Sequence, residues 1–543
     1  MSESNLITHD TTDDKEFSLG RKGWTILAVC SVLTLMVALD GTSLSVALPI
    51  ITKDLNGTAM EAFWSGTSFL ICSTVFQPTF GSLSNIFGRK AMILIANFLF
   101  LIGAILAAVS QNFTHMLVGR SIQGIGGGGV TAMSEVIVAG LVPLRLRGQY
   151  FSVINAMWSL GSVTGPILGG GFADDVTWRW IFYINIPFIA VGVIGLLILM
   201  PWDCTLGTWK QKLAQIDFIG TAIFTGGISS FLIPLTWGGV MYPWSSWHTL
   251  VPLIVGVATL VVFGFYETYY ATNPMIPPAV FENRTLKLCS LGNAVEGLIL
   301  WCGLYYLPLY YEGVKGYSSI LAGVALFPET FTVAPSTILI GILISKTGKY
   351  RWGIWSGWAI TTLGFGLMCL IQVDTSIPAW VFINIVVGLG LGFLFLPLAL
   401  GMLAASKPEH MAIICTMTSF SRCLGQGIGV AIGGVVFQNR MSVNITRYPA
   451  LEHFAGYSQD AVAVVEILKR MPQSQTKTML QQVYTDSLRI VWAVGCGLAG
   501  VMLVLSAFTR SYPLDTDKPP SVAGQSETEM GLREGDKERW RSN

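Results

Sequence analysis

The stretch Gly81-Ser-Leu-Ser-Asn-Ile-Phe-Gly-Arg-Lys90 is repeated in outline 260 positions later, where Gly341, Leu343 and Gly348 keep its spacing and Lys349 supplies the basic residue. A second match has a constant offset of 264: Gly161, Gly165, Gly169 and Gly170 return as Gly425, Gly429, Gly433 and Gly434. These matches indicate two related halves in the same orientation. Parallel repeats with a site at their interface are an architecture of membrane transporters.

The composition places these halves in lipid. Hydrophobic residues make up 52% of the 543 residues and charged residues only 12%, against roughly 25% charged residues in a soluble domain. A water-facing surface cannot be made from so few charges. The net charge of +1 provides no basic field for nucleic acid, so nucleic acid is excluded as a main partner.

The fold class predicted is an all-α integral membrane protein with fourteen transmembrane helices. A helix needs about 20 mostly apolar residues to cross the hydrocarbon layer. The windows that meet this length are 24–49, 62–83, 91–110, 114–141, 149–172, 180–201, 216–238, 249–270, 288–311, 318–344, 352–372, 378–404, 409–437 and 489–509. Spans 1–6 and 9–14 form the two six-helix halves, and spans 7 and 8 are inserted between them.

Basic residues in the short loops predict the orientation, because Lys and Arg are retained in the cytoplasm. Twelve of them fall in the loops after even-numbered spans and three in the opposite short loops, which places both termini in the cytoplasm. Three glycosylation sequons, at Asn56, Asn112 and Asn444, then lie outside. Asn444 is the one most expected to carry sugar, since the other two lie close to the bilayer.

The predicted domains follow from the spans. They are a cytoplasmic tail over 1–23, a six-helix bundle over 24–201, a two-helix insert over 202–287, a second six-helix bundle over 288–509 and a disordered cytoplasmic tail over 510–543. The second bundle includes a long outer loop, 438–488. Within that loop, 459–471 and 476–487 are predicted to form helices on the membrane surface.

Several ordered motifs give the chain a family resemblance. The stretch 81–90 resembles the loop 2–3 signature of the major facilitator superfamily, and Arg120-Ser-Ile-Gln-Gly124 resembles its span 4 motif. Gly161-Ser-Val-Thr-Gly-Pro-Ile-Leu-Gly-Gly170 is similar to the span 5 signature of its proton-coupled drug antiporters.

Two further motifs narrow the resemblance. Leu39-Asp-Gly-Thr-Ser-Leu-Ser-Val-Ala-Leu-Pro49 is similar to the span 1 motif of the fourteen-span drug:proton antiporters, and Tyr306-Leu-Pro-Leu-Tyr310 with Val314-Lys-Gly316 resembles their fungal members. The resemblance implies an efflux pump that expels lipophilic organic compounds such as mycotoxins in exchange for protons. It implies no cofactor, because the proton gradient drives transport.

The loop 2–3 motif departs from the family at one position. The gating residues that the resemblance assigns are Gly81, Asn85, Gly88, Arg89 and Lys90. The family usually has an acidic residue where this chain has Asn85. An amide can form hydrogen bonds, but it cannot form a charged latch at the inner gate.

The charges inside spans are candidates for function, because a charge at the centre of a membrane helix costs about 2.5–3.5 kcal/mol. Asp40 in span 1 and Arg120 in span 4 are expected at similar depths, so we expect them to pair. Our hypothesis is that Asp40 binds the transported proton and that Arg120 lowers its pKa when near. The alternative is a permanent ion pair that only joins two helices.

The second half carries its own buried charges, Glu296, Glu329 and Arg422. Arg422 and Glu329 both fall near mid-depth, so either they form a structural pair, or Glu329 provides a second proton or substrate-cation site. Glu135, near the inner end of span 4, is expected to have a structural role and to meet loop arginines such as Arg145.

Span 5 carries Gly161, Gly165, Gly169 and Gly170 on one face, with Pro166 among them. Glycines at a spacing of four let another backbone approach closely, and proline permits bending. The resemblance implies that this helix lies at the seam between the halves, where Gly165 and Pro166 would govern closure. Close packing alone explains the glycines equally well.

The substrate cavity is expected between spans 1, 4, 5, 9, 10 and 13. The aromatic and polar residues there are Asn155, Trp158, Asn293, Trp301, Tyr305 and Tyr306. An amphipathic aromatic lining suits a small lipophilic organic compound better than a sugar. The partners expected are therefore that compound, protons and membrane lipid.

Other classes of function receive little support. The sequence has no metal-ligand spacing among its cysteines and no G-x-x-x-x-G-K-[ST] phosphate loop, and the glycine string 124–129 lies inside a predicted span. We expect a monomer in the plasma membrane, with the vacuolar membrane as the alternative. The rival function on the same scaffold is transport of a siderophore or a basic amino acid. A membrane receptor or enzyme is the more distant rival.

Overall fold

The computed structural model describes residues 19–202, 208–239, 241–448, 450–451, 454 and 461–514. Nearly all of the two predicted tails, 1–23 and 510–543, and part of the predicted outer loop therefore lie outside the described residues. Within the described ranges the secondary structure is helical, and the only β-type pairing is an isolated bridge between Gly238 and Tyr242. The predicted all-α class is confirmed.

The first group of helices and the insert follow the sequence closely. The first group is α1 (Arg21–Asp54), α2 (Ala59–Phe87), α3 (Arg89–Ala108), α4 (Phe113–Leu141), α5 (Arg147–Gly171), a π-helical turn (Phe172–Val176), α6 (Trp180–Tyr183) and α7 (Asn185–Leu199). The insert contains α8 (Trp209–Ala214), α9 (Phe218–Trp237) and α10 (Trp247–Tyr269), followed by a 3-10 turn (Pro278–Phe281).

The second group contains both short and long helices. These are α11 (Arg284–Gly313), α12 (Ser319–Ala325), α13 (Phe327–Thr347), α14 (Arg351–Met368), α15 (Ile377–Ala404), a 3-10 turn (Pro408–His410), α16 (Met411–Ile445), α17 (Ala461–Arg470) and α18 (Gln475–Ser506). Predicted span 318–344 is divided between α12 and α13, because α13 begins at Phe327 with Pro328 in its first turn, and proline has no amide hydrogen to continue the preceding helix.

The predicted surface helix at 476–487 is wrong. These residues form the first turns of α18, which runs without a break from Gln475 to Ser506, and Leu480, Val483 and Tyr484 are buried there. The apolar side chains that gave 476–487 its amphipathic pattern pack against protein rather than lipid. The other predicted surface helix, 459–471, corresponds to α17.

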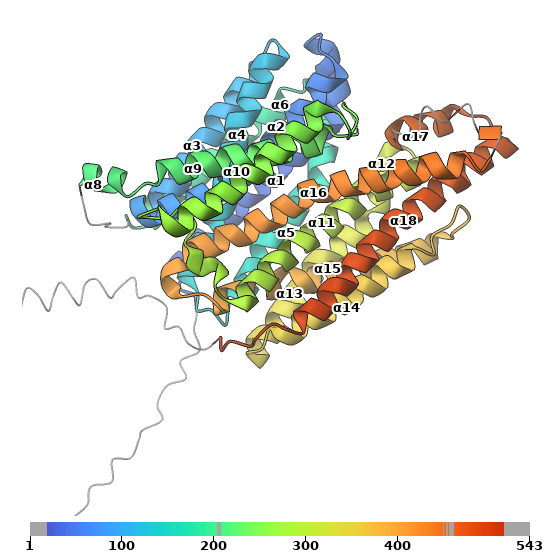
Figure 1. The fold of residues 1–543 in the computed structure, drawn as a ribbon. Coiled ribbons are helices and arrows are strands. Elements are labelled where there is room, and N and C mark those ends of the chain that lie inside the picture. The colour runs from blue at the N-terminus through green and yellow to red at the C-terminus, as the bar shows by residue number, and fades with distance from the viewer. Residues whose placement is uncertain are drawn as a thin grey trace, which may run out of the picture.

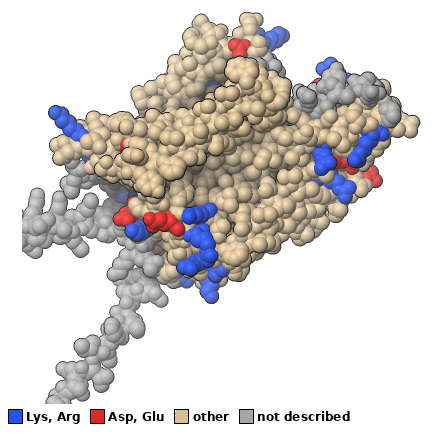
Figure 2. Space-filling view, viewed as in Figure 1, with Lys and Arg blue, Asp and Glu red and all other residues tan. Residues whose placement is uncertain are grey.

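Twelve of the described helical segments are long and apolar enough to cross a membrane. The two predicted spans not among them are α2, with 29 residues, and α14, with 18 residues. Serines, threonines and Gln77 lower the hydropathy of α2, and Arg351 does so in α14. Figure 2 shows charged side chains near the helix ends and an uncharged surface over most of the face between them. The chain is a multi-pass membrane protein, and fourteen spans remain a prediction.

The two groups of helices lie beside each other in Figure 1, with blue to cyan helices in the first and yellow to red in the second. The green helices α9 and α10 pack on each other, and α9 also contacts α2 and α16. The two groups meet through α2 and α4 against α16, and through α5 against α13 and α15. The insert therefore covers one edge of this junction.

The terminal glycine of each loop motif has a conformational reason. Gly88 has φ +89° and separates α2 from α3, while Gly348 has φ +65° and follows α13. Residues that carry a side chain rarely adopt these φ angles, whereas glycine adopts them without steric cost. The last glycine of the repeated motif thus ends a helix in both halves.

The glycine repeat places equivalent helix pairs in direct contact. Gly161 and Gly169 of α5 face the backbone of α1, with a Cβ at Gly161 only 2.8 Å from the Leu35 carbonyl oxygen. Gly425 and Gly429 of α16 face the backbone of α11 in the same way. The expectation that α5 lies at the seam between halves is confirmed by its contacts with α13 and α15, but its glycine face packs within its own group. The contact of α5 with α13 lies instead at Gly148 and Gly341.

Gly425→Ala is expected to destabilise the protein by about 1–3 kcal/mol, the usual cost of overpacking. The added Cβ would overlap the carbonyl oxygen of Ala294, which belongs to the α11 backbone and cannot move aside as a side chain can. Gly427→Ala on the same helix is the matched control, because its Cβ would lie 3.5 Å from the flexible side chain of Leu232. Thermal denaturation of the purified protein in detergent measures both. Equal melting temperatures for the two variants would contradict the packing argument.

Candidate functional site

Asp40 lies at the centre of a buried polar cluster in the first group. It is 1% exposed. Its Oδ2 accepts a hydrogen bond from Arg120 Nη1 at 2.6 Å, and its Oδ1 accepts bonds from Gln123 Nε2 and Asn185 Nδ2, both at 2.8 Å. The expected pairing of Asp40 with Arg120 is present. Three donors together satisfy the buried carboxylate.

Arg120 is held by more than its carboxylate partner. It is fully buried, Nε donates to the Ser65 carbonyl oxygen at 3.1 Å, and Nη1 also donates to Gln123 Oε1 at 2.8 Å. The Phe69 ring lies 4.3 Å from the guanidinium carbon, a cation–π distance. The cluster thus ties α1, α2, α4 and α7 around one carboxylate.

Sequence reasoning missed two members of this cluster. Gln123 lies three residues after Arg120 on α4, so helical spacing places both on one face, and this signal was available. Asn185 begins α7 and has no such relation to Asp40. Its Oδ1 is buried without a hydrogen-bond partner among the described residues, while its Nδ2 also donates to the Ile181 carbonyl oxygen at 3.3 Å.

Arg422 is the corresponding centre of the second group, but its partner differs from the one expected. Its Nε donates to Glu296 Oε2 at 2.8 Å, and Nη2 donates to Asn293 Oδ1 and to the Phe395 carbonyl oxygen, each at 3.1 Å. The predicted pairing with Glu329 is wrong. Similar depth along two helices placed Glu329 near Arg422, but helix rotation turns Glu296 toward the guanidinium.

Glu329 is isolated within the second group. It is fully buried, and neither carboxyl oxygen has a hydrogen-bond partner among the described residues. Gly303 of α11 lies beside it, since a Cβ there would be 3.4 Å from Oε1. An ionised carboxylate in this position would be very costly, so Glu329 is suited to the neutral, protonated form.

Glu135 connects the two groups of helices. Ser419 Oγ on α16 donates to Glu135 Oε2 on α4 at 2.7 Å. The expected partner, Arg145, instead donates from Nε to the Ser345 carbonyl oxygen at 2.9 Å. That expectation is wrong because the Glu135 side chain projects toward α16 rather than toward the loop after α4.

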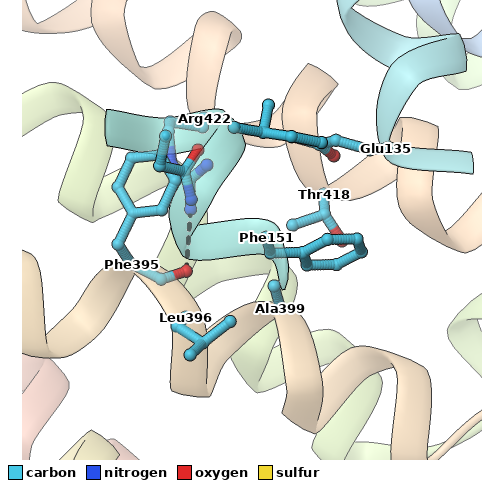
Figure 3. A pocket seen from close by; sticks show the side chains of 9 residues that line it. Glu135, Phe151, Phe395, Leu396, Ala399, Thr418 and Arg422 are labelled. Carbon is cyan, nitrogen blue, oxygen red and sulfur yellow. Dashed lines mark hydrogen bonds between the residues drawn. The ribbon is translucent and has the colours of Figure 1, made fainter. Parts of the chain in front are cut away.

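Figure 3 shows Glu135, Thr418 and Arg422 around a small cavity between the groups. Its volume is about 10 Å³, close to the space that one water molecule needs. Asn155, Phe151 and Ile154 of α5 line it together with residues of α15 and α16. Among the predicted cavity residues, Asn155 is therefore placed beside Arg422.

The other predicted cavity residues fall into an exposed or half-buried set and a buried set. Trp158 is 37% and Tyr305 42% exposed, and Trp301 is half-buried. Asn293 and Tyr306 are buried: Asn293 bonds Arg422, and Tyr306 donates to the Val430 carbonyl oxygen at 3.2 Å. The rings of Trp158 and Tyr305 are thus exposed at the surface of the bundle, whereas Asn293 and Tyr306 hold helices together.

The groups also meet at the end of the bundle that carries the loops 88–89, 142–146, 348–350 and 405–410, which we call the basic end. Gly81 of α2 contacts the Thr416 side chain of α16, and Gln149 donates to Ser345 Oγ. Asn85, in the predicted gating motif, is exposed.

Lys90 was predicted to take part in gating, but it lies within the first group of helices. Its Nζ donates to the Leu197 and Met200 carbonyl oxygens at 2.9 and 2.5 Å, and the side chain is 2% exposed. A cation at the carbonyl end of a helix is electrostatically favourable. Lys90 thus fastens α3 to the end of α7 within the first group.

The three sequons differ in accessibility. Asn444 is half-buried in the last turn of α16, and its Nδ2 donates to Ser487 Oγ at 3.2 Å. Asn112 is exposed, but its Oδ1 caps α4 by accepting from the His115 amide. Asn56 is exposed in the turn after α1. Access therefore favours Asn56 over Asn444, the reverse of the order expected from membrane distance.

Each group of membrane helices contains a buried ion pair, and the two groups meet through a polar junction, an arrangement found in membrane transporters. The sequence matches the Major Facilitator Superfamily over residues 30–430. The chain belongs to this family.

Similar fungal proteins cover nearly the whole chain. It is 48% identical to "MFS transporter L2" of Phoma sp. over 95% of this chain and 86% of that protein. It is 33% identical to "MFS-type efflux pump LUC4" of Fusarium sp., covering 100% and 96% of the two chains. It is 34% identical to "Efflux pump FUS6" of Gibberella fujikuroi over 95% and 92%.

A solved structure supports the fold. The crystal structure of the human organic anion transporter MFSD10 aligns with a TM-score of 0.55 at 16% identity, covering 89% of this chain and 99% of that chain. At this identity the likeness concerns the fold alone.

Proposed function

We propose that this protein exports small lipophilic organic compounds, of the kind made as fungal secondary metabolites or toxins, in exchange for protons. The observation that carries the proposal is the buried Asp40–Arg120 pair in a chain whose relatives are named efflux pumps. Intramembrane ion pairs are expensive and mark ion pathways in transporters.

The proposed proton step takes place at Asp40. When Arg120 lies 2.6 Å away, the ionised carboxylate is favoured. A rocking motion that separates α1 from α4 would remove this cation and leave a buried carboxylate that binds a proton. Protonation of Asp40 would thus alternate with its pairing to Arg120. In transporters with two parallel halves, alternating access is rocking of one half against the other, and the proposed step couples a shift of α1 relative to α4 within the first half to that rocking.

The proposed topology has fourteen spans, with α2 and α14 completing the twelve apolar helices, and with both termini in the cytoplasm. Two six-helix halves flank the inserted α9 and α10. The basic residues in alternate short loops support this orientation. We place the protein in the plasma membrane, as a monomer that works without a cofactor.

The geometry gives less support to a basic amino acid or another cation as substrate. Glu296 is neutralised by Arg422, and Glu329 is fully buried behind Gly303. Neither carboxylate is available at an accessible surface. The exposed rings of Trp158 and Tyr305 favour an apolar compound.

Cells that carry this protein are expected to hold less of the exported compound inside and to release more outside than cells without it. A protonophore should remove the difference, because one proton crossing 100 mV contributes about 2.3 kcal/mol. Untargeted mass spectrometry of cells and medium measures both pools. Gly427→Ala serves as a variant control expected to keep activity. Unchanged distributions of all organic solutes would refute the proposed function.

A further inference from the structure

We infer that Glu135 is a second proton-carrying carboxylate, placed so that its protonation controls the contact between the two groups of helices. This inference rests on the proposed proton-coupled transport and adds a second site to it. The first support is position. Glu135 belongs to α4 and bonds Ser419 of α16, 284 residues away in sequence, so any separation of α4 from α16 must break this bond.

The second support is the arrangement along α16. Thr416, Ser419 and Arg422 follow one another at intervals of three, so successive members are neighbours on a strip that winds slowly around the helix. Thr416 contacts Gly81, Ser419 contacts Glu135, and Arg422 faces the cavity that Glu135 also lines. Glu135 thus lies between the packed contact at the basic end and the buried cation.

The third support is the balance of charge. Arg422 lines the same cavity as Glu135, but its Nε is already committed to Glu296 at 2.8 Å. Two ionised carboxylates beside one guanidinium leave one negative charge without compensation in a water-poor junction. Such a charge is strongly disfavoured, and binding one proton removes it. Because Glu296 holds the closer position, the proton belongs on Glu135.

Among the described residues, Arg422 is the cation whose charge acts on Glu135. The titratable side chains near Glu135 on α16 are the thiols of Cys415 and Cys423. Gln77 of α2 donates a hydrogen bond to Cys423 Sγ. Arg89 and Arg147 lie toward the basic end, where Arg147 Nε donates to the Val142 carbonyl oxygen. Arg120 is 15 residues, or roughly 22 Å, farther along α4 and is paired with Asp40.

In the proposed step, Glu135 takes up one proton and later releases it. While the groups are joined, Glu135 takes a proton from water that reaches the small cavity, and the neutral carboxyl keeps its hydrogen bond with Ser419. When the basic ends part, Glu135 meets water there and releases the proton to it. The ionised carboxylate then opposes closure until it is protonated again. Joined helices are therefore favoured at low pH and separated helices at high pH.

The test measures this pH response without any substrate. In a chain whose own cysteines are replaced by serine or alanine, Lys22→Cys and Lys407→Cys place spin labels on exposed positions near the start of α1 and between α15 and α16. Double electron–electron resonance in lipid nanodiscs then reports their separation. With Glu135 intact, the short-distance population should be lost as pH rises. With Glu135→Gln, it should persist at every pH.

Matched variants separate charge from simple attachment. Ser419→Ala removes the hydrogen bond but keeps the charges, so the pH response should remain. Glu296→Gln removes the competing carboxylate, so Arg422 can hold ionised Glu135 and the short distance should persist at high pH. Asp54→Asn should leave the response unchanged, since Asp54 is 55% exposed at the end of α1 and belongs to neither buried site.

Two outcomes would overturn the inference: a label distance that does not change with pH when Glu135 is intact, or the same pH response in Glu135→Gln. Neither outcome decides the proposed function, because protonophore-sensitive export is measured independently. Conversely, a chain that exports nothing would refute the proposed function even if the label distance responds to pH.

Discussion

Asp40→Asn is expected to lower the steady-state ratio of exported compound outside to inside by about 50-fold at a membrane potential of 100 mV. One proton contributes about 2.3 kcal/mol under these conditions, and 1.36 kcal/mol corresponds to a factor of ten. An asparagine cannot carry the proton, so this contribution is lost.

Asp54→Asn is the matched control for Asp40→Asn. Both residues belong to α1, but Asp54 ends the helix, is 55% exposed and bonds Trp178 Nε1 at 2.9 Å. Its substitution removes a carboxylate of the same helix without touching the buried pair. Reconstituted vesicles with an imposed proton gradient provide the measurement. Export by Asp40→Asn that is as steep and as sensitive to protonophore as in the unmodified protein would leave Asp40 with only a structural role.

Arg422→Leu is expected to destabilise the protein by about 3–5 kcal/mol, because it leaves the Glu296 carboxylate buried without its cation. Glu296 is fully buried, and its Oε1 already lacks a partner among the described residues. The double variant with Glu296→Leu should recover much of this loss, since apolar replacement of both members of a buried pair is often neutral.

A double-mutant cycle on purified protein, followed by thermal unfolding in detergent, measures the coupling between Arg422 and Glu296. The same cycle with Glu329→Gln in place of Glu296→Leu is the control, because the structure separates Glu329 from Arg422. A coupling to Glu329 as large as that to Glu296 would show that the pairing in the second group has been assigned incorrectly.

Hydropathy and spacing were sufficient for most of the fold. The all-helical class and most helix positions follow from apolar runs of known length, and the repeated glycines predict two similar pairs of helices. These signals depend on residues near one another in sequence. The outer loop was predicted less well, because the amphipathic face of 476–487 is equally suited to lipid and to protein.

The candidate site shows the same limit. Similar depth was enough to predict the pairing of Asp40 with Arg120, because the helices that carry them also turn these side chains toward each other. Depth alone failed for Arg422, whose partner is Glu296 rather than Glu329, and for Glu135, which turns to Ser419 rather than Arg145. Rotation of a helix about its axis decides these contacts. A single sequence contains little information about it when both faces are apolar.

The glycine-packed pairs α1–α5 and α11–α16 also constrain how new export specificities can evolve. Their facing surfaces meet backbone to backbone, so almost any larger side chain there damages the protein before it alters a substrate. The exposed aromatic positions Trp158 and Tyr305 bear no such restriction. Larger side chains are therefore tolerated better at a few exposed positions than on the facing surfaces of the paired helices.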